Sequence, residues 1–158
     1  MGHSTLRIQG TIKGKPVSVL IDSGSTHSFV TPRLAKEGVE LVHTSPLAIT
    51  VANGERLYST AKCRQLEWMM QGNSFVHDLR VLQMGGSDMV LGVDWMKRYS
   101  PLVFDFNEMT VSFSKEGKQV KLKGGSTVST LKIISGERLQ KLAGKEADLM
   151  GEFYMFIS

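Results

Sequence analysis

An aspartate at the end of an apolar run constrains this chain more than any other feature. Residues 17–21 are typical of a buried strand, and they lead directly into Asp22 and then into Ser23-Gly24-Ser25-Thr26. A buried carboxylate costs free energy unless hydrogen-bond donors surround it. This stretch supplies such donors through its three hydroxyl groups and through a backbone that can approach closely at the glycine. The stretch predicts a carboxylate held in a tight polar turn on rigid support, which suits acid–base catalysis.

Length and composition limit the classes of protein to which this chain can belong. With 158 residues the chain is long enough for one compact domain with a real core. It contains no run of about 18 apolar residues, so no membrane span is expected. The N-terminus lacks an apolar signal core, and Cys63 is the single cysteine, which fits a reducing compartment, so we expect a cytoplasmic protein. Since no Cys and His residues cluster at metal-ligand spacing, neither a metal nor another cofactor is expected.

The net charge of +4 is unevenly distributed. Residues 115–145 hold eight of the basic residues against Glu116 and Glu137. Such a stretch can contact nucleic acid, but no aromatic residue interleaves the lysines for base stacking. A solvated face is therefore the favoured interpretation, and nucleic-acid binding is not expected of the domain.

Alternating apolar residues and regularly spaced turns predict a mainly β chain. The strongest short hairpin signal is Asn53-Gly54, between two strand-like runs. Thr31 followed by Pro32 predicts the start of a short helix. We expect strands at 5–12, 17–21, 46–52, 56–64, 66–70, 75–82, 89–93, 103–106, 109–113 and 119–123, and short helices at 31–37, 94–99 and 136–143.

Two motifs in the same order indicate an internal quasi-repeat. A strand, a turn and a second strand precede Asp22, and the same order precedes Val90-Leu91-Gly92, about seventy residues later, which a short helix follows. The run Ile21-Asp22-Ser23-Gly24-Ser25-Thr26-His27-Ser28-Phe29 resembles the active-site loop of retropepsin-like aspartic proteases of gypsy-type, plant-type retrotransposons. Val90-Leu91-Gly92-Val93-Asp94-Trp95-Met96 is similar to their second motif. The resemblance covers roughly residues 6–123. It implies an all-β, closed barrel with two or three short helices, acting as a two-fold homodimer.

The resemblance also implies roles for individual residues. Asp22 would be the catalytic acid/base, the Ser23 hydroxyl would tie the paired loops together across the dimer, and Gly24 would give a backbone N–H to the carboxylate. Ser25 would orient the carboxylate from outside. The implied substrate-binding residues are Ser25, the hairpin tip Ala52, Asn53 and Gly54, and Leu91 on the pocket wall.

Hydrolysis by this route needs two carboxylates that share one proton. The chain has one Asp-Ser-Gly, and structural roles are expected for Asp88 and Asp94. The second carboxylate would then be Asp22 of another copy, placed by a two-fold axis. The resulting hypothesis is an aspartic endopeptidase that processes a retrotransposon polyprotein.

Two other functions stay open at this stage. One is a retropepsin-like module that dimerises and grips peptides without cutting them, and the other is a nucleic-acid-binding fragment of the polyprotein. The Gly124-Gly125-Ser126-Thr127 run indicates a boundary between a protease domain, 1–123, and a C-terminal segment, 124–158. That segment would be a linker toward a reverse transcriptase or an arm that covers the dimer.

Overall fold

A computed structural model describes residues 4–51 and 53–124. The expected helix at 136–143 lies outside these residues, as does almost all of the C-terminal segment. The elements in chain order are β1 (Thr5–Ile12), β2 (Lys15–Asp22), β3 (Phe29–Val30), α1 (Pro32–Ala35), β4 (Glu40–Thr50), β5 (Arg56–Met70), β6 (Asn73–Val81), β7 (Met89–Leu91), α2 (Val93–Met96), β8 (Val103–Asp105), β9 (Thr110–Lys115) and β10 (Lys118–Lys123).

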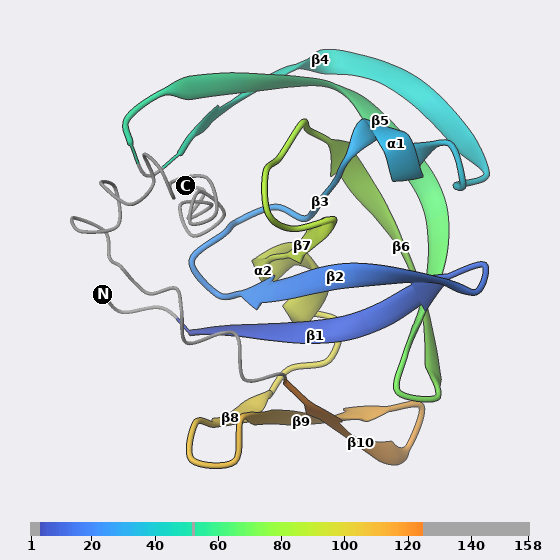
Figure 1. Ribbon diagram of the computed structural model, residues 1–158, viewed down its shortest axis with the longest axis vertical. Helices are drawn as coiled ribbons and strands as arrows, with labels where there is room; N and C mark the ends of the chain where they lie inside the picture. The colour runs from blue at the N-terminus through green and yellow to red at the C-terminus, as the bar shows by residue number, and fades with distance from the viewer. Residues whose placement is uncertain (1–3, 52, 125–158) are drawn as a thin grey trace.

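Seven strands form one sheet that closes on itself. Their order is β1-β2-β7-β3-β6-β5-β4, and an additional pairing of β1 with β5 joins Thr11 to Met69. In Figure 1, β4 and β5 arch over the middle of the molecule, where β2, β3 and β7 lie. A closed sheet leaves few unpaired edges, which protects the backbone hydrogen-bonding groups. The predicted all-β barrel with short helices is confirmed.

The first hairpin carries Asp22 to its place. Its turn is formed by Lys13 and Gly14, whose φ angles of 50° and 81° match the left-handed conformation of a two-residue hairpin turn. From that turn β1 and β2 pair in register to the far end, where Thr5 lies opposite Asp22. β7 runs parallel to β2 on its other side, with Leu91 opposite Ile21. Asp22 is therefore the last residue of a strand held on both edges.

The long hairpin differs from the prediction in two ways. β4 starts at residue 40 rather than 46, and a register shift between His43 and Leu47 accommodates Pro46 within this strand. The expected strands 56–64 and 66–70 are one strand, β5, with an irregularity between Cys63 and Leu66. There Gln65 adopts a φ of 52°. Such a bulge bends the strand, so that its first part pairs with β4 and its second part with β6.

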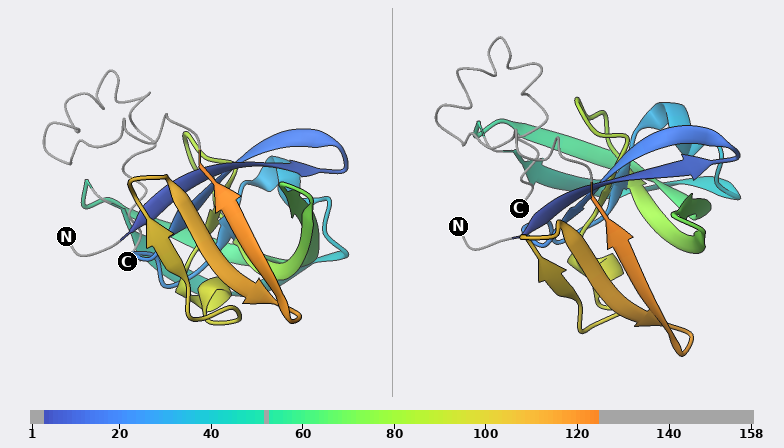
Figure 2. Two further views of the ribbon diagram at one scale, coloured as in Figure 1. Left: turned by 90° about the horizontal axis from the view of Figure 1, so that it is seen from below. Right: turned by 60° about the horizontal axis from the view of Figure 1, so that its bottom comes forward.

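Two apolar clusters fill the molecule. The larger lies between the barrel and a three-stranded sheet of β8, β9 and β10, which Figure 2 shows on one side of the molecule. Its centre is aromatic: Phe75 stacks on Trp68 at 5.7 Å and meets Trp95 edge-on at 5.7 Å. The smaller cluster lies under the β4–β5 hairpin. The strand that carries Asp22 thus has a buried apolar cluster on each side.

Both described helices are single turns. α1 begins after Thr31, as predicted, and α2 spans residues 93–96, shorter than the expected 94–99, with turns continuing to Tyr99. Within 4–51 and 53–124 no helix is long and apolar enough to cross a bilayer.

Cys63 is buried, and this burial raises the pKa of its thiol to about 11.

Candidate active site

Asp22 lies buried at the start of a tight loop. The backbone N–H of Gly24 donates to its Oδ1 at 2.8 Å, and the N–H of Ser25 donates to its backbone oxygen at 3.1 Å. The second carboxylate oxygen, Oδ2, is buried and has no hydrogen-bond partner in the described part of the chain. Burial raises the pKa of Asp22 from 3.8 to about 7, with the Gly24 hydrogen bond opposing it. Near neutrality the carboxyl group can therefore both hold and release a proton.

The neighbouring serines hold the loop itself. The Oγ of Ser23 accepts the backbone N–H of Ser4 at 2.6 Å, and the Ser23 N–H donates to the Ser4 oxygen at 2.9 Å. The Ser23 hydroxyl hydrogen stays available for a partner loop. Ser25 was expected to orient the carboxylate, but its hydroxyl donates to the backbone oxygen of His27 at 2.7 Å instead. Because the Ser25 side chain is fully buried, its hydroxyl shapes the loop and does not contact the Asp22 carboxylate.

The second motif crosses directly beneath this loop. The Val93 N–H donates to the Ser25 oxygen at 2.8 Å, and the Gly92 N–H donates to the Ser28 hydroxyl at 2.9 Å. A Cβ at Gly92 would overlap the backbone oxygens of His27 and Ser25. The glycine is therefore required by close backbone approach, not by its own torsion angles.

Gly92→Ala should be strongly destabilising because rigid backbone atoms cannot yield to the added methyl group. We expect a loss of about 3 kcal/mol in the free energy of unfolding, measured by denaturant titration. Gly85→Ala is the matched control, since a Cβ there meets nothing within 4 Å. Equal stability of the two variants would contradict the close contact between the motifs.

Asp88 and Asp94 have hydrogen-bonded positions away from Asp22. Asp88 accepts the Ser18 N–H at 2.8 Å and pairs with Arg33 at 3.1 Å. Asp94 accepts the Ser28 hydroxyl at 2.6 Å. Neither forms a pair with Asp22 within the described residues, so this subunit supplies one carboxylate to the site.

The β4–β5 hairpin covers an apolar cluster beside the Asp22 loop. Ile49 and Val51 from the hairpin pack against Phe29, Met84 and Val90. Leu91 was expected on the pocket wall, but it is fully buried in the other cluster, on the opposite face of β7. Successive side chains of a strand alternate between faces, and the prediction assigned the wrong one.

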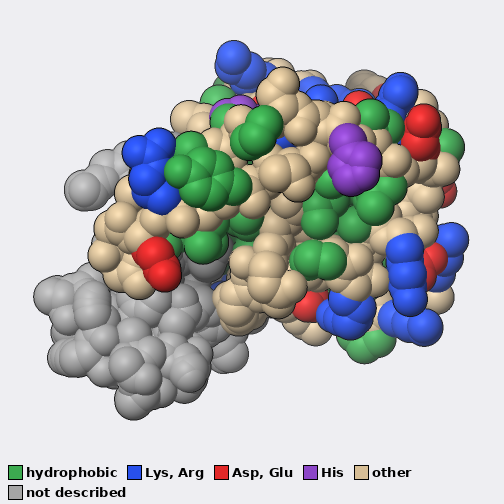
Figure 3. Space-filling view, turned by 90° about the horizontal axis from the view of Figure 1, so that it is seen from above, with side chains coloured by type: hydrophobic (Ala, Val, Ile, Leu, Met, Phe, Trp, Pro, Cys, Tyr) green, Lys and Arg blue, Asp and Glu red, His purple; other side chains and the backbone are tan. Residues whose placement is uncertain are grey.

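The hairpin tip is exposed and tightly turned. Asn53 Oδ1 accepts the Glu55 N–H at 2.8 Å, and Gly54 has a φ of 90°. Ala52 lies outside the described residues. Figure 3 views the molecule from above, onto β4 and β5, and shows hydrophobic side chains in separate groups with Lys and Arg among them. The inner face of the hairpin, by contrast, packs on the buried apolar cluster that includes Phe29, Met84 and Val90.

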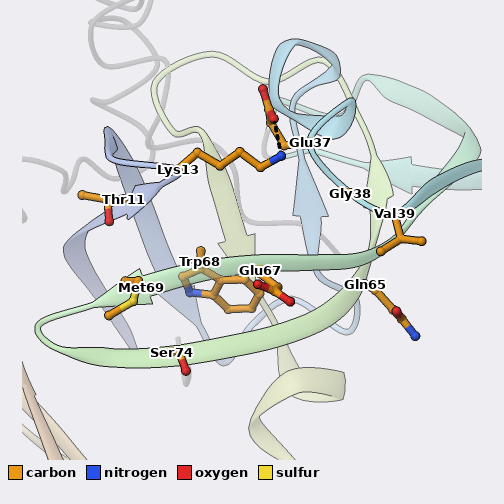
Figure 4. Close-up of a pocket in the computed structure, with 10 residues that line it drawn as sticks. All are labelled: Thr11, Lys13, Glu37, Gly38, Val39, Gln65, Glu67, Trp68, Met69 and Ser74. Atoms are coloured by element: carbon orange, nitrogen blue, oxygen red, sulfur yellow. Dashed lines mark ion pairs between the residues drawn. The ribbon is translucent and has the colours of Figure 1, made fainter.

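A cavity of about 510 Å³ lies elsewhere, at the turn end of the first hairpin. Figure 4 shows the ion pair between Lys13 and Glu37, at 3.1 Å, on its rim, and Trp68 and Met69 on its wall. The catalytic loop contributes nothing to its lining. In the described ranges no three His, Cys, Asp or Glu side chains form a group that could hold a metal ion.

A buried Asp-Ser-Gly carboxylate, crossed from beneath by a second glycine motif and lying beside an apolar cluster under a hairpin, is the arrangement of a retropepsin-like acid-protease loop. Residues 4–119 match the family described as retroviral aspartyl protease, and the chain belongs to that family.

Among solved structures, the fold is similar to the crystal structure of the retroviral protease-like domain of Ddi1 from Leishmania major. The TM-score is 0.54 at 16% identity, with 77% of this chain and 94% of that chain covered. No curated protein matches the chain.

Proposed function

We propose that the chain is an aspartic endopeptidase whose active site forms from two copies. One observation carries the proposal: the buried Asp22 has a raised pKa and an unpartnered Oδ2 in a protease-type loop. A buried polar atom without a partner is costly, so its persistence indicates a functional demand. A second Asp22 across a two-fold axis would supply the missing partner through one shared proton.

The chemistry follows from that shared proton. The ionised Asp22 accepts a proton from a water molecule, while the protonated Asp22 of the other copy donates its proton to the scissile carbonyl oxygen. The water oxygen bonds to the carbonyl carbon and gives a neutral tetrahedral gem-diol. The carbon–nitrogen bond then breaks as the nitrogen takes up a proton from the protonated Asp22. A hydroxyl proton of the gem-diol passes to the ionised Asp22. One protonated and one ionised carboxyl group therefore remain.

The substrate is an extended peptide with apolar side chains near the scissile bond. The inner face of the hairpin rests on the apolar cluster that includes Phe29, Met84 and Val90. A peptide entering beneath the hairpin would exchange these contacts for its own apolar side chains, and the backbone groups at Asn53 and Gly54 would pair with its main chain. A polyprotein of a long-terminal-repeat retrotransposon is the substrate source that fits the sequence resemblance.

Asp22→Asn should abolish cleavage of a library of apolar peptides, with a loss of about 10³-fold or more, because asparagine cannot cycle a proton. Asp105→Asn is the matched control, since this exposed carboxylate caps a turn by accepting the N–H groups of Asn107 and Glu108. Product formation is followed by mass spectrometry. If the native protein binds these peptides without cutting them, the peptide-binding module is the better account.

A further inference from the structure

A chain of hydrogen bonds runs from the surface to the base of the catalytic loop. It begins at Arg98, whose guanidinium lies 3.1 Å from Nδ1 of His77. Nε2 of His77 lies 3.5 Å from Oδ2 of Asp94. The other carboxylate oxygen, Oδ1, accepts the Ser28 hydroxyl at 2.6 Å. The Ser28 oxygen in turn accepts the N–H of Gly92 at 2.9 Å.

The donors and acceptors of this chain have one consistent assignment. Arginine only donates, so Nδ1 of His77 must accept, and its ring proton is on Nε2, directed at Asp94. A carboxylate only accepts, so the Ser28 hydroxyl must donate to it, which leaves the Ser28 lone pair for Gly92. Asp94 also accepts the Trp95 N–H at 2.8 Å. The orientation of the buried Ser28 hydroxyl is therefore fixed from both sides.

The charge of Asp94 keeps this arrangement in place. Partial burial alone would raise its pKa, but the hydrogen bonds from His77 and Ser28 bring it below the ordinary value. Asp94 therefore stays ionised around neutrality, where it accepts from both neighbours. Arg98 also donates to the Val76 oxygen at 2.6 Å, which anchors the outer end of the chain on β6.

We propose that Ser28, Asp94 and His77 are positioning residues for Asp22. This inference rests on the proposed function. The three side chains tie the end of the catalytic loop to the start of α2 and to β6, and the Ser25 backbone links the same loop to Val93 and Asp22. Locked in this way, the loop keeps water from the catalytic carboxylate and holds it at a defined angle.

The test follows the titration of Asp22 itself, by carboxyl ¹³C NMR, together with kcat and KM of peptide cleavage. Ser28→Ala removes the link between Gly92 and Asp94, and Ser28→Thr keeps the hydroxyl. Loosening the loop admits water, so the Asp22 midpoint in Ser28→Ala should fall by about one pH unit or more toward the ordinary value. We expect kcat to drop about tenfold or more with KM little changed, and Ser28→Thr to restore both.

Ser59→Ala is the matched control, a buried serine on β5 whose hydroxyl donates to the Ala61 oxygen at 3.3 Å. The titration midpoint of Asp22 should be the same in Ser59→Ala as in the native protein. If Ser28→Ala does not fold, Asp94→Asn decides by the same criterion, because it keeps an acceptor for Ser28 but turns an amide toward His77. An unchanged Asp22 midpoint in a folded variant overturns the inference, whatever its stability.

The NMR readout separates this inference from the proposed function. If no peptide is cleaved by the native protein, the endopeptidase proposal fails. The midpoint comparison between Ser28→Ala and Ser28→Thr still decides whether these residues control the surroundings of Asp22.

Discussion

Asp22→Asn should make the isolated subunit more stable at about pH 8, by about 4 kcal/mol in the free energy of unfolding. The native carboxyl must lose its proton in a buried site, where its pKa is raised from 3.8 to about 7. Asparagine keeps the Oδ1 acceptor for Gly24 but carries no charge. The group that carries the proposed chemistry is thus predicted to lower the stability of the subunit at pH 8.

The direction of the Asp22 pKa shift determines the pH range over which the two proteins differ in stability. Because the folded-state pKa lies above the unfolded one, the folded subunit binds more protons between about pH 4 and pH 7, and its stability falls as pH rises through that range. The two proteins should therefore differ by less than about 1 kcal/mol near pH 4. Urea titrations of monomeric, dilute protein measure the difference, with Asp105→Asn as control. A gap that stays constant with pH would mean that Asp22 is not buried as described.

The sequence alone was sufficient for the site's main elements. The apolar run before Asp22, the Asn53-Gly54 turn and the glycine motif at Gly92 each have strong local signatures, and the structure places the glycine motif directly against the Asp22 loop. Local signals of this kind depend on neighbouring residues, so they can be identified without knowing the fold.

The predictions failed for structural features that are determined by residues distant in sequence. The face of β7 occupied by Leu91 depends on its register against β2 and β3, which no residue of β7 specifies. The bulge at Gln65 likewise depends on Asp78, whose carboxylate accepts the Gln65 N–H at 2.8 Å. The two-residue strand β3 is too short to give any periodic signal.

The supporting network under the loop was also beyond sequence reasoning. A structural role was expected for Asp94, and no role of its own was predicted for Ser28. Their contact joins positions 66 residues apart, and His77 comes from a third element. The Ser25 hydroxyl was assigned to the carboxylate because of its proximity in sequence, although a backbone oxygen two residues on is its partner.

The proposed catalysis by two Asp22 side chains predicts a large effect when subunits are mixed. Under this proposal, a subunit carrying Asp22→Asn should keep the surface that pairs with another copy, so it should exchange into dimers while contributing no ionisable group. A mixed dimer then has one carboxyl, and the shared-proton chemistry needs two. The Asp22→Asn protein should therefore inhibit peptide cleavage by the native protein, even though it binds substrate no more tightly than the native protein does.

Subunit mixing is the measurement that tests the shared site most directly. Native protein is held at constant concentration, and Asp22→Asn protein is added to a roughly ninefold excess under conditions where subunits exchange. Random pairing leaves about one tenth of the native subunits with a native partner, so peptide cleavage should fall about tenfold. Added Asp105→Asn protein, as control, should instead raise the rate. Cleavage that stays constant when the Asp22→Asn protein is added would show that Asp22 works alone, and the two-subunit site would be wrong.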